Sequence, residues 1–252
     1  MIVELFGPPG AGKTTFSKAL AARLREAGRV VDLHLSARPG EEALASTSRG
    51  EAHSMPSPAD PFRRVARPLL QLIAAMVAGA DLRDSSTEAL VSKLPRGHPI
   101  SALRMRQYLV RLSAAWREAR NSGHIVIFDQ GYVQAISSIL LSQAPLPDED
   151  VVTMLVAAPP SDLAIHVNAP MGEIERRLKL RGEAIGRLGR MFESELGAAP
   201  DHARAAQRLE AGLRRIGRTV LEVDSANAKM LGVEIDRVQL EIDGHCRGIA
   251  AE

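Results

Sequence analysis

The stretch IVELFGPPGAGKTTFSKAL, residues 2–20, combines several local patterns in a fixed order. Residues 2–6 are mostly apolar and β-prone, which is typical of a buried strand. The segment Gly7-Pro8-Pro9-Gly10 then stops this run, since glycine and proline interrupt regular structure. Apolar residues next recur at helical spacing from Phe16 to Leu24. The stretch therefore predicts a strand, a tight loop and a helix.

The loop in this stretch, GPPGAGKT at residues 7–14, matches the phosphate-loop pattern G-x-x-x-x-G-K-[ST] at every position. Glycines let such a loop turn its backbone N–H groups toward one anion, and the following helix adds the positive end of its dipole. Lys13 is expected to reach the β- and γ-phosphates of ATP, and the Thr14 hydroxyl to bind Mg²⁺. The alternative, a glycine-rich turn without a ligand, is disfavoured by the strand before the loop and the helix after it. The residues expected to contact the nucleotide are Gly7, Pro8, Pro9, Gly10, Ala11, Gly12, Lys13, Thr14 and Thr15.

Four further β-runs follow along the chain, separated mostly by helical patterns. Apolar and polar residues alternate over 31–36, and this strand is expected to end at the segment 38–40. Residues 125–128 are continuously β-branched or aromatic, as in a strand buried on both faces, and 163–167 and 219–223 complete the set. Right-handed crossovers put helices on both faces of a parallel sheet, so we expect a three-layer α/β fold. Ligands of such sheets bind at the carboxyl ends of the strands.

A long helix is predicted over 99–121. Its apolar face is expected to hold Met105, Leu109, Leu112 and Trp116, and its polar face Arg104, Gln107, Tyr108 and Arg111. Before it, residues 41–60 show little periodicity and are interpreted as a loop, and 61–79 as an Ala-rich helix. Another helix, through Ile139, is expected after the segment 129–131.

Asp129 follows the buried run 125–128, where P-loop proteins place a second acidic residue near the metal. Its carboxylate can hold Mg²⁺ through water or accept a proton from an attacking hydroxyl. An Asp at this position can also cap the helix that follows. The neighbouring Gln130 either positions substrate or water or is a surface amide, and Tyr132 either lines the acceptor site or packs in the core.

The helix expected after residue 170 carries Arg177 and Arg181 on one face. Two guanidinium groups spaced in this way can close over a transferring phosphoryl group, which predicts an arginine-bearing lid over about 170–195. The alternative is a solvated helix face on which Glu173 pairs with Arg177. Further arginines shortly afterwards favour the lid.

Several of these segments, taken in order, carry a resemblance. They are the phosphate loop, Arg38-Pro39-Gly40, Phe128-Asp129-Gln130-Gly131 and Arg177-Leu178-Lys179-Leu180-Arg181-Gly182. Together they resemble thymidylate kinase and its relatives, the nucleoside and nucleoside-monophosphate kinases, over about residues 1–224. The resemblance implies a core of five parallel strands, an Arg-supplying lid, and an acceptor site between the second and third strands.

The resemblance also assigns expected roles to residues outside the phosphate loop. It implies that Arg38 contacts the phosphoryl acceptor, and that Arg104 and Arg111 face the same cleft. It places the loop after the last strand, with Ser225 and Asn227, against the adenine. Proteins of this group often form homodimers through helices packed beside the sheet.

The chain departs from this family next to its acidic residue. Thymidylate kinases typically have Asp-Arg-Tyr where this chain has Asp129-Gln130-Gly131, and a fuller Arg-Glu-Pro-Gly-Gly at Arg38-Pro39-Gly40. The missing arginine weakens the case for a nucleotide phosphate as acceptor. The fold and the ATP half of the site therefore transfer more directly than the substrate.

The leading functional hypothesis is an ATP-dependent kinase of a small molecule, with nucleosides and nucleotides favoured by the resemblance. In this hypothesis Lys13, Asp129, Arg177 and Arg181 are catalytic, and Arg38, Arg104, Arg111, Gln130 and Tyr132 bind the acceptor. One alternative is an ATPase or GTPase that acts as a switch, although the Asn/Thr-Lys-x-Asp guanine motif is absent from the sequence. Another is a protein that senses nucleotide without transferring phosphate.

Composition limits the remaining possibilities. The net charge is +2, acidic and basic residues are interspersed, and 3% of residues are aromatic, so we expect no nucleic-acid partner. No His or Cys spacing supports a zinc site, and His124 and His166 are interpreted as structural. The single Cys246, the phosphate loop close to Met1 and the shortness of the apolar runs predict a cytoplasmic protein without signal peptide or membrane span. We expect one domain over 1–252, with an acceptor-site segment at about 38–122.

Overall fold

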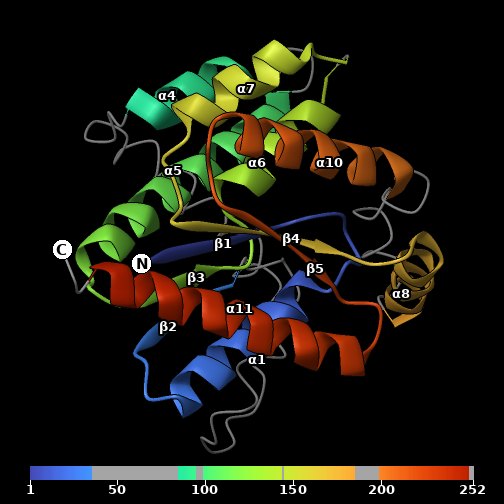
Figure 1. The fold of residues 1–252 in the computed structure, drawn as a ribbon. Coiled ribbons are helices and arrows are strands. Elements are labelled where there is room, and N and C mark those ends of the chain that lie inside the picture. Colours follow the sequence, from blue (N-terminus) through green and yellow to red (C-terminus); the bar gives the residue numbers. More distant parts are fainter. Residues whose placement is uncertain (36–84, 95–98, 144, 185–198, 250–252) are drawn as a thin grey trace, which may run out of the picture.

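A sheet of five parallel strands lies at the centre of the computed structural model, in the order β2-β3-β1-β4-β5 (Figure 1). The structure describes residues 1–35, 85–94, 99–143, 145–184 and 199–249. The strands are β1 (Ile2–Phe6), β2 (Val31–His34), β3 (Ile125–Phe128), β4 (Leu163–Asn168) and β5 (Val220–Asp224). The described helices are α1 (Lys13–Glu26), α4 (Ser85–Ser92), α5 (Pro99–Asn121), α6 (Tyr132–Leu141), α7 (Asp148–Ala157), α8 (Met171–Ala184), α10 (Ala199–Arg215) and α11 (Ala228–Ile249).

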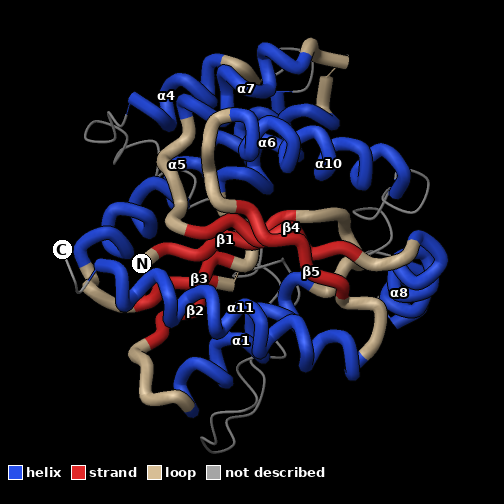
Figure 2. The backbone as a smooth tube through the Cα atoms, viewed as in Figure 1, coloured by secondary structure: helices blue, strands red, loops and turns tan. Residues whose placement is uncertain are grey.

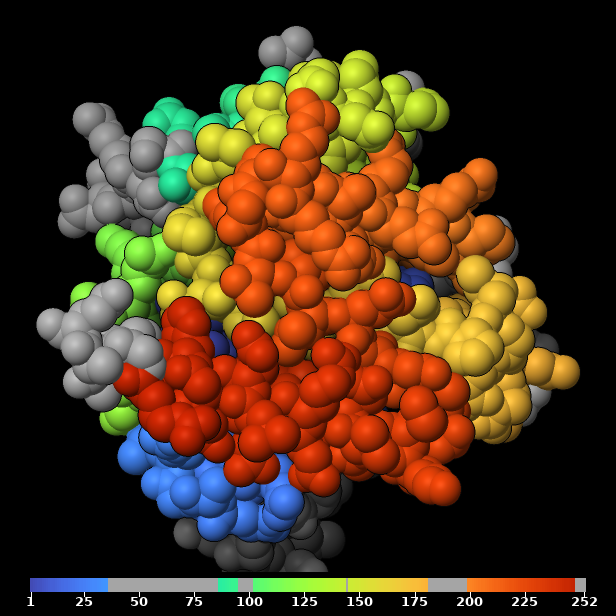
Figure 3. Space-filling model, in the orientation of Figure 1, coloured from blue at the N-terminus to red at the C-terminus, as the bar shows by residue number. Residues whose placement is uncertain are grey.

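Helices cover both faces of the sheet, and alternate residues of each strand point to opposite layers (Figure 2). In β1, Val3 and Leu5 pack with α1 and α11, whereas Ile2 and Phe6 pack with α5, α6, α7 and α10. In the space-filling view α10 and α11, which belong to opposite layers, flank the sheet above and below, with α8 beside them at the edge (Figure 3). The expected three-layer α/β fold is confirmed.

The strand register brings several loops to one edge of the sheet. Phe6 in β1 pairs with His166 in β4, and His166 pairs with Glu222 in β5. On the other side of β1, the last pair between β2 and β3 is His34 with Phe128. Because all strands are parallel, the loops that follow β1, β3, β4 and β5 meet at this carboxyl edge.

The predicted strands agree with the structure to within one residue except at the end of the second strand, whereas α4 and α7 were not predicted. The helix predicted over 99–121 is confirmed as α5, and its face with Leu109, Leu112 and Trp116 is buried. The second strand was expected to continue to residue 36, but β2 ends at His34 because β3, its only partner in the sheet, ends at the paired Phe128. The loop expected at 41–60 and the helix expected at 61–79 lie outside the described residues.

Aromatic packing joins α5 to the sheet directly beneath the carboxyl edge. The Trp116 ring lies 4.7 Å from the Phe128 ring and 5.1 Å from the Tyr132 ring, measured between centroids. All these side chains are buried, so they fix α5 and the start of α6 against the end of β3.

Among the helices in the described part of the chain, none has the length and apolar character needed to cross a bilayer.

Candidate functional site

The phosphate loop joins β1 to α1 at the carboxyl edge of the sheet, as the sequence predicts. Gly7, Gly10 and Gly12 all have positive φ, and two of them show why glycine is needed. Gly7 has φ 142°, and a Cβ atom there would lie 2.2 Å from the Val167 carbonyl oxygen. Gly12, the N-cap of α1, has φ 89° in the left-handed region. The loop therefore follows a path that only glycine permits, directly against β4.

Lys13 lies under the loop and is only 8% exposed. Its ammonium group donates hydrogen bonds to the carbonyl oxygens of Gly7, at 2.7 Å, and Pro8, at 3.0 Å. These bonds hold the ammonium group against the first two residues of the loop. This arrangement suits a loop that binds the phosphates of a nucleotide.

Thr14 and Asp129 meet beside the loop. The Thr14 hydroxyl, at the exposed start of α1, donates a hydrogen bond of 3.0 Å to Oδ2 of the buried Asp129. Asp129 follows β3 immediately, and its backbone N–H donates to the His34 carbonyl. A hydroxyl and a carboxylate oxygen are hard ligands of the kind that Mg²⁺ prefers. The two residues that the sequence assigns to the metal are therefore adjacent and chemically suited to it.

Arg177 connects α8 to the phosphate loop and to the segment after β5. Its guanidinium donates to the carbonyl oxygens of Gly10 (3.3 Å), Ser225 (2.6 Å) and Ala226 (3.1 Å). Its Nε also donates to Glu173 at 2.7 Å. The Glu173–Arg177 pair of the alternative is therefore present in the structure, whereas contact of Arg177 with a transferring phosphoryl group stays a prediction. Arg177 lies at the phosphate loop but is held by backbone carbonyls.

Of the other predicted arginines, the structure describes the side chains of Arg104 and Arg111 but not those of Arg38 and Arg181. Arg181 lies in α8, one helical turn after Arg177, but its side chain is outside what the structure describes. Arg38 also lies outside the described residues. Arg104 and Arg111 are exposed on α5 and flank Tyr108 on the same helix face.

Tyr108 attaches this polar face of α5 to the loop that carries Asp129. Its hydroxyl donates a 2.9 Å hydrogen bond to the carbonyl oxygen of Gln130. Burial, and then the nearby charges of Asp129 and Glu4, raise the pKa of Tyr108 well above its ordinary value. Tyr108 therefore stays protonated and keeps its donor. The contact places the α5 face that carries Arg104 and Arg111 next to the loop with Gln130, and the acceptor cleft that the resemblance implies there stays a prediction.

Tyr132 corrects one expectation. It is fully buried, its ring packs edge-on against Trp116, and its hydroxyl lies 3.3 Å from the Thr87 hydroxyl. A side chain without exposed surface cannot line an open acceptor site. The core-packing alternative therefore describes Tyr132, because α6 begins directly under α4 and α5.

Ser225 and Asn227 both have structural partners in the loop after β5. Ser225 is buried, and its hydroxyl donates to the carbonyl oxygen of Ala11 in the phosphate loop. Oδ1 of Asn227 accepts the N–H groups of Lys229 (3.1 Å) and Met230 (3.0 Å), so it caps the first turn of α11. The loop expected to lie against the adenine is thereby fastened to the phosphate loop.

Two buried polar residues that were not predicted form hydrogen bonds with the backbone around the site. The buried Glu4 in β1 accepts the N–H of Val133 at 3.0 Å, and Oε1 of Gln134 accepts the N–H of Gly7 at 3.1 Å. In the sequence, Glu4 is a single acid within an otherwise apolar strand, and that interruption is the signal that could have identified it. Gln134 carries no comparable signal, since an isolated amide in a helix is ordinary.

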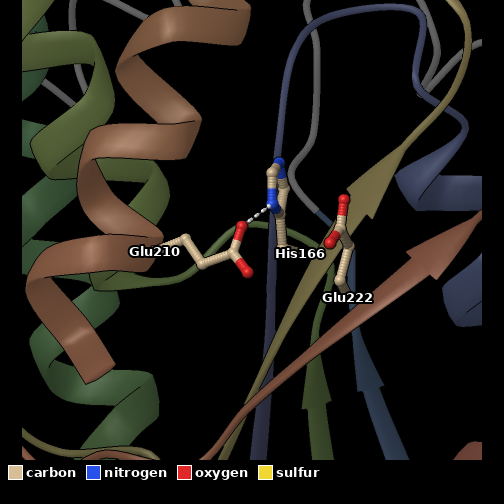
Figure 4. A group of neighbouring side chains, drawn as sticks. All are labelled: His166, Glu210 and Glu222. Atoms are coloured by element: carbon tan, nitrogen blue, oxygen red, sulfur yellow. Dashed lines mark hydrogen bonds and ion pairs between the residues drawn. The ribbon is translucent and has the colours of Figure 1, made fainter.

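A second polar cluster lies next to the phosphate loop, on β4, β5 and α10 (Figure 4). Nδ1 of the buried His166 lies 2.6 Å from Glu210, whose other oxygen pairs with Arg214 at 2.6 Å. Possible metal-ligand atoms of His166, Glu210 and Glu222 lie within 4.8 Å of one another. The His166 ring also stacks on Phe6, with centroids 4.9 Å apart. The expected structural role of His166 agrees with these contacts, since both oxygens of Glu210 already have cationic or donor partners.

A cavity of about 480 Å³ opens at the carboxyl ends of β4 and β5. Its lining residues are Asn168, Ala169, Pro170, Glu222, Val223, Asp224 and Glu234. The three carboxylates in this lining repel anions. The cavity is therefore unsuited to a triphosphate.

The comparisons with known proteins show similarity in structure alone. No protein-family model matches the chain, and no curated protein matches its sequence. Among solved structures, the deoxyadenosine kinase from M. mycoides with bound dATP is similar to it with a TM-score of 0.47 and 15% sequence identity. The alignment covers 96% of this chain and 100% of that chain.

Proposed function

We propose that the protein is an ATP-dependent kinase that transfers the γ-phosphoryl group to a small-molecule acceptor. The observation that carries the proposal is the 3.0 Å contact between the Thr14 hydroxyl and the Asp129 carboxylate beside the phosphate loop. It brings together a cradle for phosphate, oxygen ligands for Mg²⁺ and an acid next to both. These are the components that phosphoryl transfer requires.

The chain's own groups then act mainly by position and charge. Backbone N–H groups from Gly10 to Lys13 bind the phosphates, and the Lys13 ammonium offsets their negative charge. Thr14 and Asp129 would hold Mg²⁺, which when bound neutralises charge on the phosphates. Arg177 and Arg181 add positive charge from α8, and closure of this helix over the phosphates would exclude water.

The acceptor is proposed to enter between β2 and β3, on the side of the site that α5 forms. The exposed Arg104 and Arg111 flank Tyr108 there, and Gln130 lies in the loop that Tyr108 holds. In the alternative in which Asp129 does not hold the metal, its carboxylate accepts the proton of the attacking hydroxyl at the same edge. We favour a nucleoside or nucleotide as acceptor from the resemblance in sequence, and the replacement of arginine by Gln130 favours an acceptor without a phosphate at that point.

The direct test is to incubate the protein with γ-labelled ATP, Mg²⁺ and pooled metabolites, and to identify labelled products by mass. A labelled small molecule, formed only when the pool is present, is the expected result. Label released only as inorganic phosphate would contradict the proposal and indicate an ATPase. Tight ATP binding without any product from a broad pool would contradict it as well, and would indicate a nucleotide sensor.

A further inference from the structure

Glu4 is a fully buried carboxyl group in the middle of β1. Its neighbours along the strand, Val3 and Leu5, are buried and apolar. Burial raises the pKa of Glu4, and hydrogen bonds from Val133 and Ser161 and the charge of Arg218 oppose this shift. Burying a carboxyl group costs free energy unless its oxygens are hydrogen-bonded. The hydrogen-bond partners of Glu4 therefore indicate its structural role.

Those partners lie at the start of α6 and before β4. Oε2 accepts the backbone N–H of Val133 at 3.0 Å, and Oε1 accepts the Ser161 hydroxyl at 2.8 Å. N–H groups in the first turn of a helix have no partner within the helix. The N-cap residue, Gly131, has no side chain with which to accept one. Glu4 therefore caps α6 from a different element of the fold.

Gly131 fits this arrangement because of its size. A Cβ atom at residue 131 would lie 2.3 Å from Oε2 of Glu4 and 2.9 Å from its Cβ. Glu4 is enclosed on all sides, so its side chain has no room to move away. The glycine that replaces the tyrosine of the related kinases thus allows the carboxylate to approach the helix.

The capped turn is attached to Asp129 through a very short connection. Residues 129–131 alone join β3 to α6, and β3 is fixed within the sheet. A displacement of the first turn of α6 must therefore move Asp129 relative to Thr14. Gln134, in the same turn, accepts the N–H of Gly7, so this turn also touches the phosphate loop.

From these contacts we infer that Glu4 is a positioning residue, which by capping α6 holds the Asp129 carboxylate beside Thr14. The inference rests on the proposed function, in which the Asp129 carboxylate and the Thr14 hydroxyl hold Mg²⁺. Glu4 itself is enclosed in the interior and does not touch the phosphate loop. Its effect is exerted through Val133 and the 129–131 connection.

The test is the Mg²⁺ concentration needed for half-maximal ATP binding, which requires no acceptor. Glu4→Leu removes both acceptor oxygens and should raise this concentration on the order of tenfold, as loss of a group that orients a metal ligand does. Glu4→Gln can still offer an oxygen to Val133 and an N–H to Ser161, so it should restore a value near that of the wild type. Ile139→Ala removes buried volume from the same helix away from its first turn, and should leave the Mg²⁺ requirement unchanged while lowering stability.

Gly131→Ala provides a second variant if Glu4→Leu does not fold. Its methyl group must displace either the carboxylate or the 129–131 connection, so the Mg²⁺ requirement should again rise. An unchanged requirement in a folded Glu4→Leu or Gly131→Ala protein would overturn the positioning role and leave the proposed function intact. Absence of Mg²⁺-dependent ATP binding in the wild type would instead overturn the proposed function, and the positioning role with it.

Discussion

Thr14 and Asp129 come from positions 115 residues apart, yet their side chains form a hydrogen bond beside the phosphate loop. Each residue could be identified from its local sequence, as the last position of a phosphate motif and as the acid after a buried strand. Their contact depends on β1 and β3 being neighbours in the sheet. That adjacency is a property of the fold and not of either motif.

The first prediction concerns the Thr14 hydroxyl. Thr14→Val keeps the shape of the side chain but removes the oxygen, so Mg²⁺-dependent ATP binding should weaken at least about tenfold. Thr14→Ser keeps the hydroxyl and serves as the matched control, with affinity near that of the wild type. Titration calorimetry at several Mg²⁺ concentrations measures both. Equal affinities for the valine and serine variants would argue against a metal ligand at residue 14.

The raised pKa of Glu4 gives a prediction about pH. Its ordinary value is 4.5, and burial raises it in the folded state. Between about pH 4.5 and the raised pKa of Glu4, the folded protein binds more protons than the unfolded chain. The contribution of Glu4 to the free energy of unfolding therefore falls as the pH rises through this range. The Glu4→Gln variant has no carboxyl group that titrates at this position. The free energy of unfolding of the variant should therefore rise relative to that of the wild type as the pH increases from about 4.5. Denaturant unfolding at a series of pH values tests this, and a constant difference would contradict it.

At the scale of elements, α8 shows how local and tertiary interactions combine. Hydrogen bonds from Arg176, and then from Arg177, lower the pKa of Glu173 to about 2. The spacing of Glu173 and Arg177 made their pairing predictable from sequence. The bond from Arg177 to Gly10 was not predictable in this form, because it depends on where α8 lies relative to the phosphate loop.

The N-cap of α11 gives a prediction at the scale of elements. Asn227→Ala removes the oxygen that accepts two first-turn N–H groups, and should lower the free energy of unfolding by roughly 1 kcal/mol. Asn227→Asp retains a capping oxygen and should lose little stability. Chemical denaturation of both variants measures the difference. Equal losses for the two would show that the cap does not account for the effect.

Across the whole molecule, the strand pattern was the most predictable feature. The runs at Ile2–Phe6 and Ile125–Phe128 are apolar and bounded by turn residues, and both strands have these bounds in the structure. The strand order was not evident from local patterns, since pairing depends on the whole sheet. Glu4 and Gln134 were missed for a similar reason, because their partners lie more than a hundred residues away in sequence.

Phosphoryl transfer at the phosphate loop should depend on the Lys13 ammonium group, and the Lys13→Ala variant measures this dependence. The measurement is the rate at which γ-labelled phosphate passes from Mg²⁺-ATP to the acceptor found in the metabolite pool. Because Lys13 supplies a positive charge at the loop, its removal should slow transfer about 10²-fold or more in a folded protein. Lys18→Ala, which changes an exposed lysine further along α1, should transfer at the wild-type rate. Undiminished transfer by a folded Lys13→Ala protein would show that the phosphate loop is not the site of phosphoryl transfer.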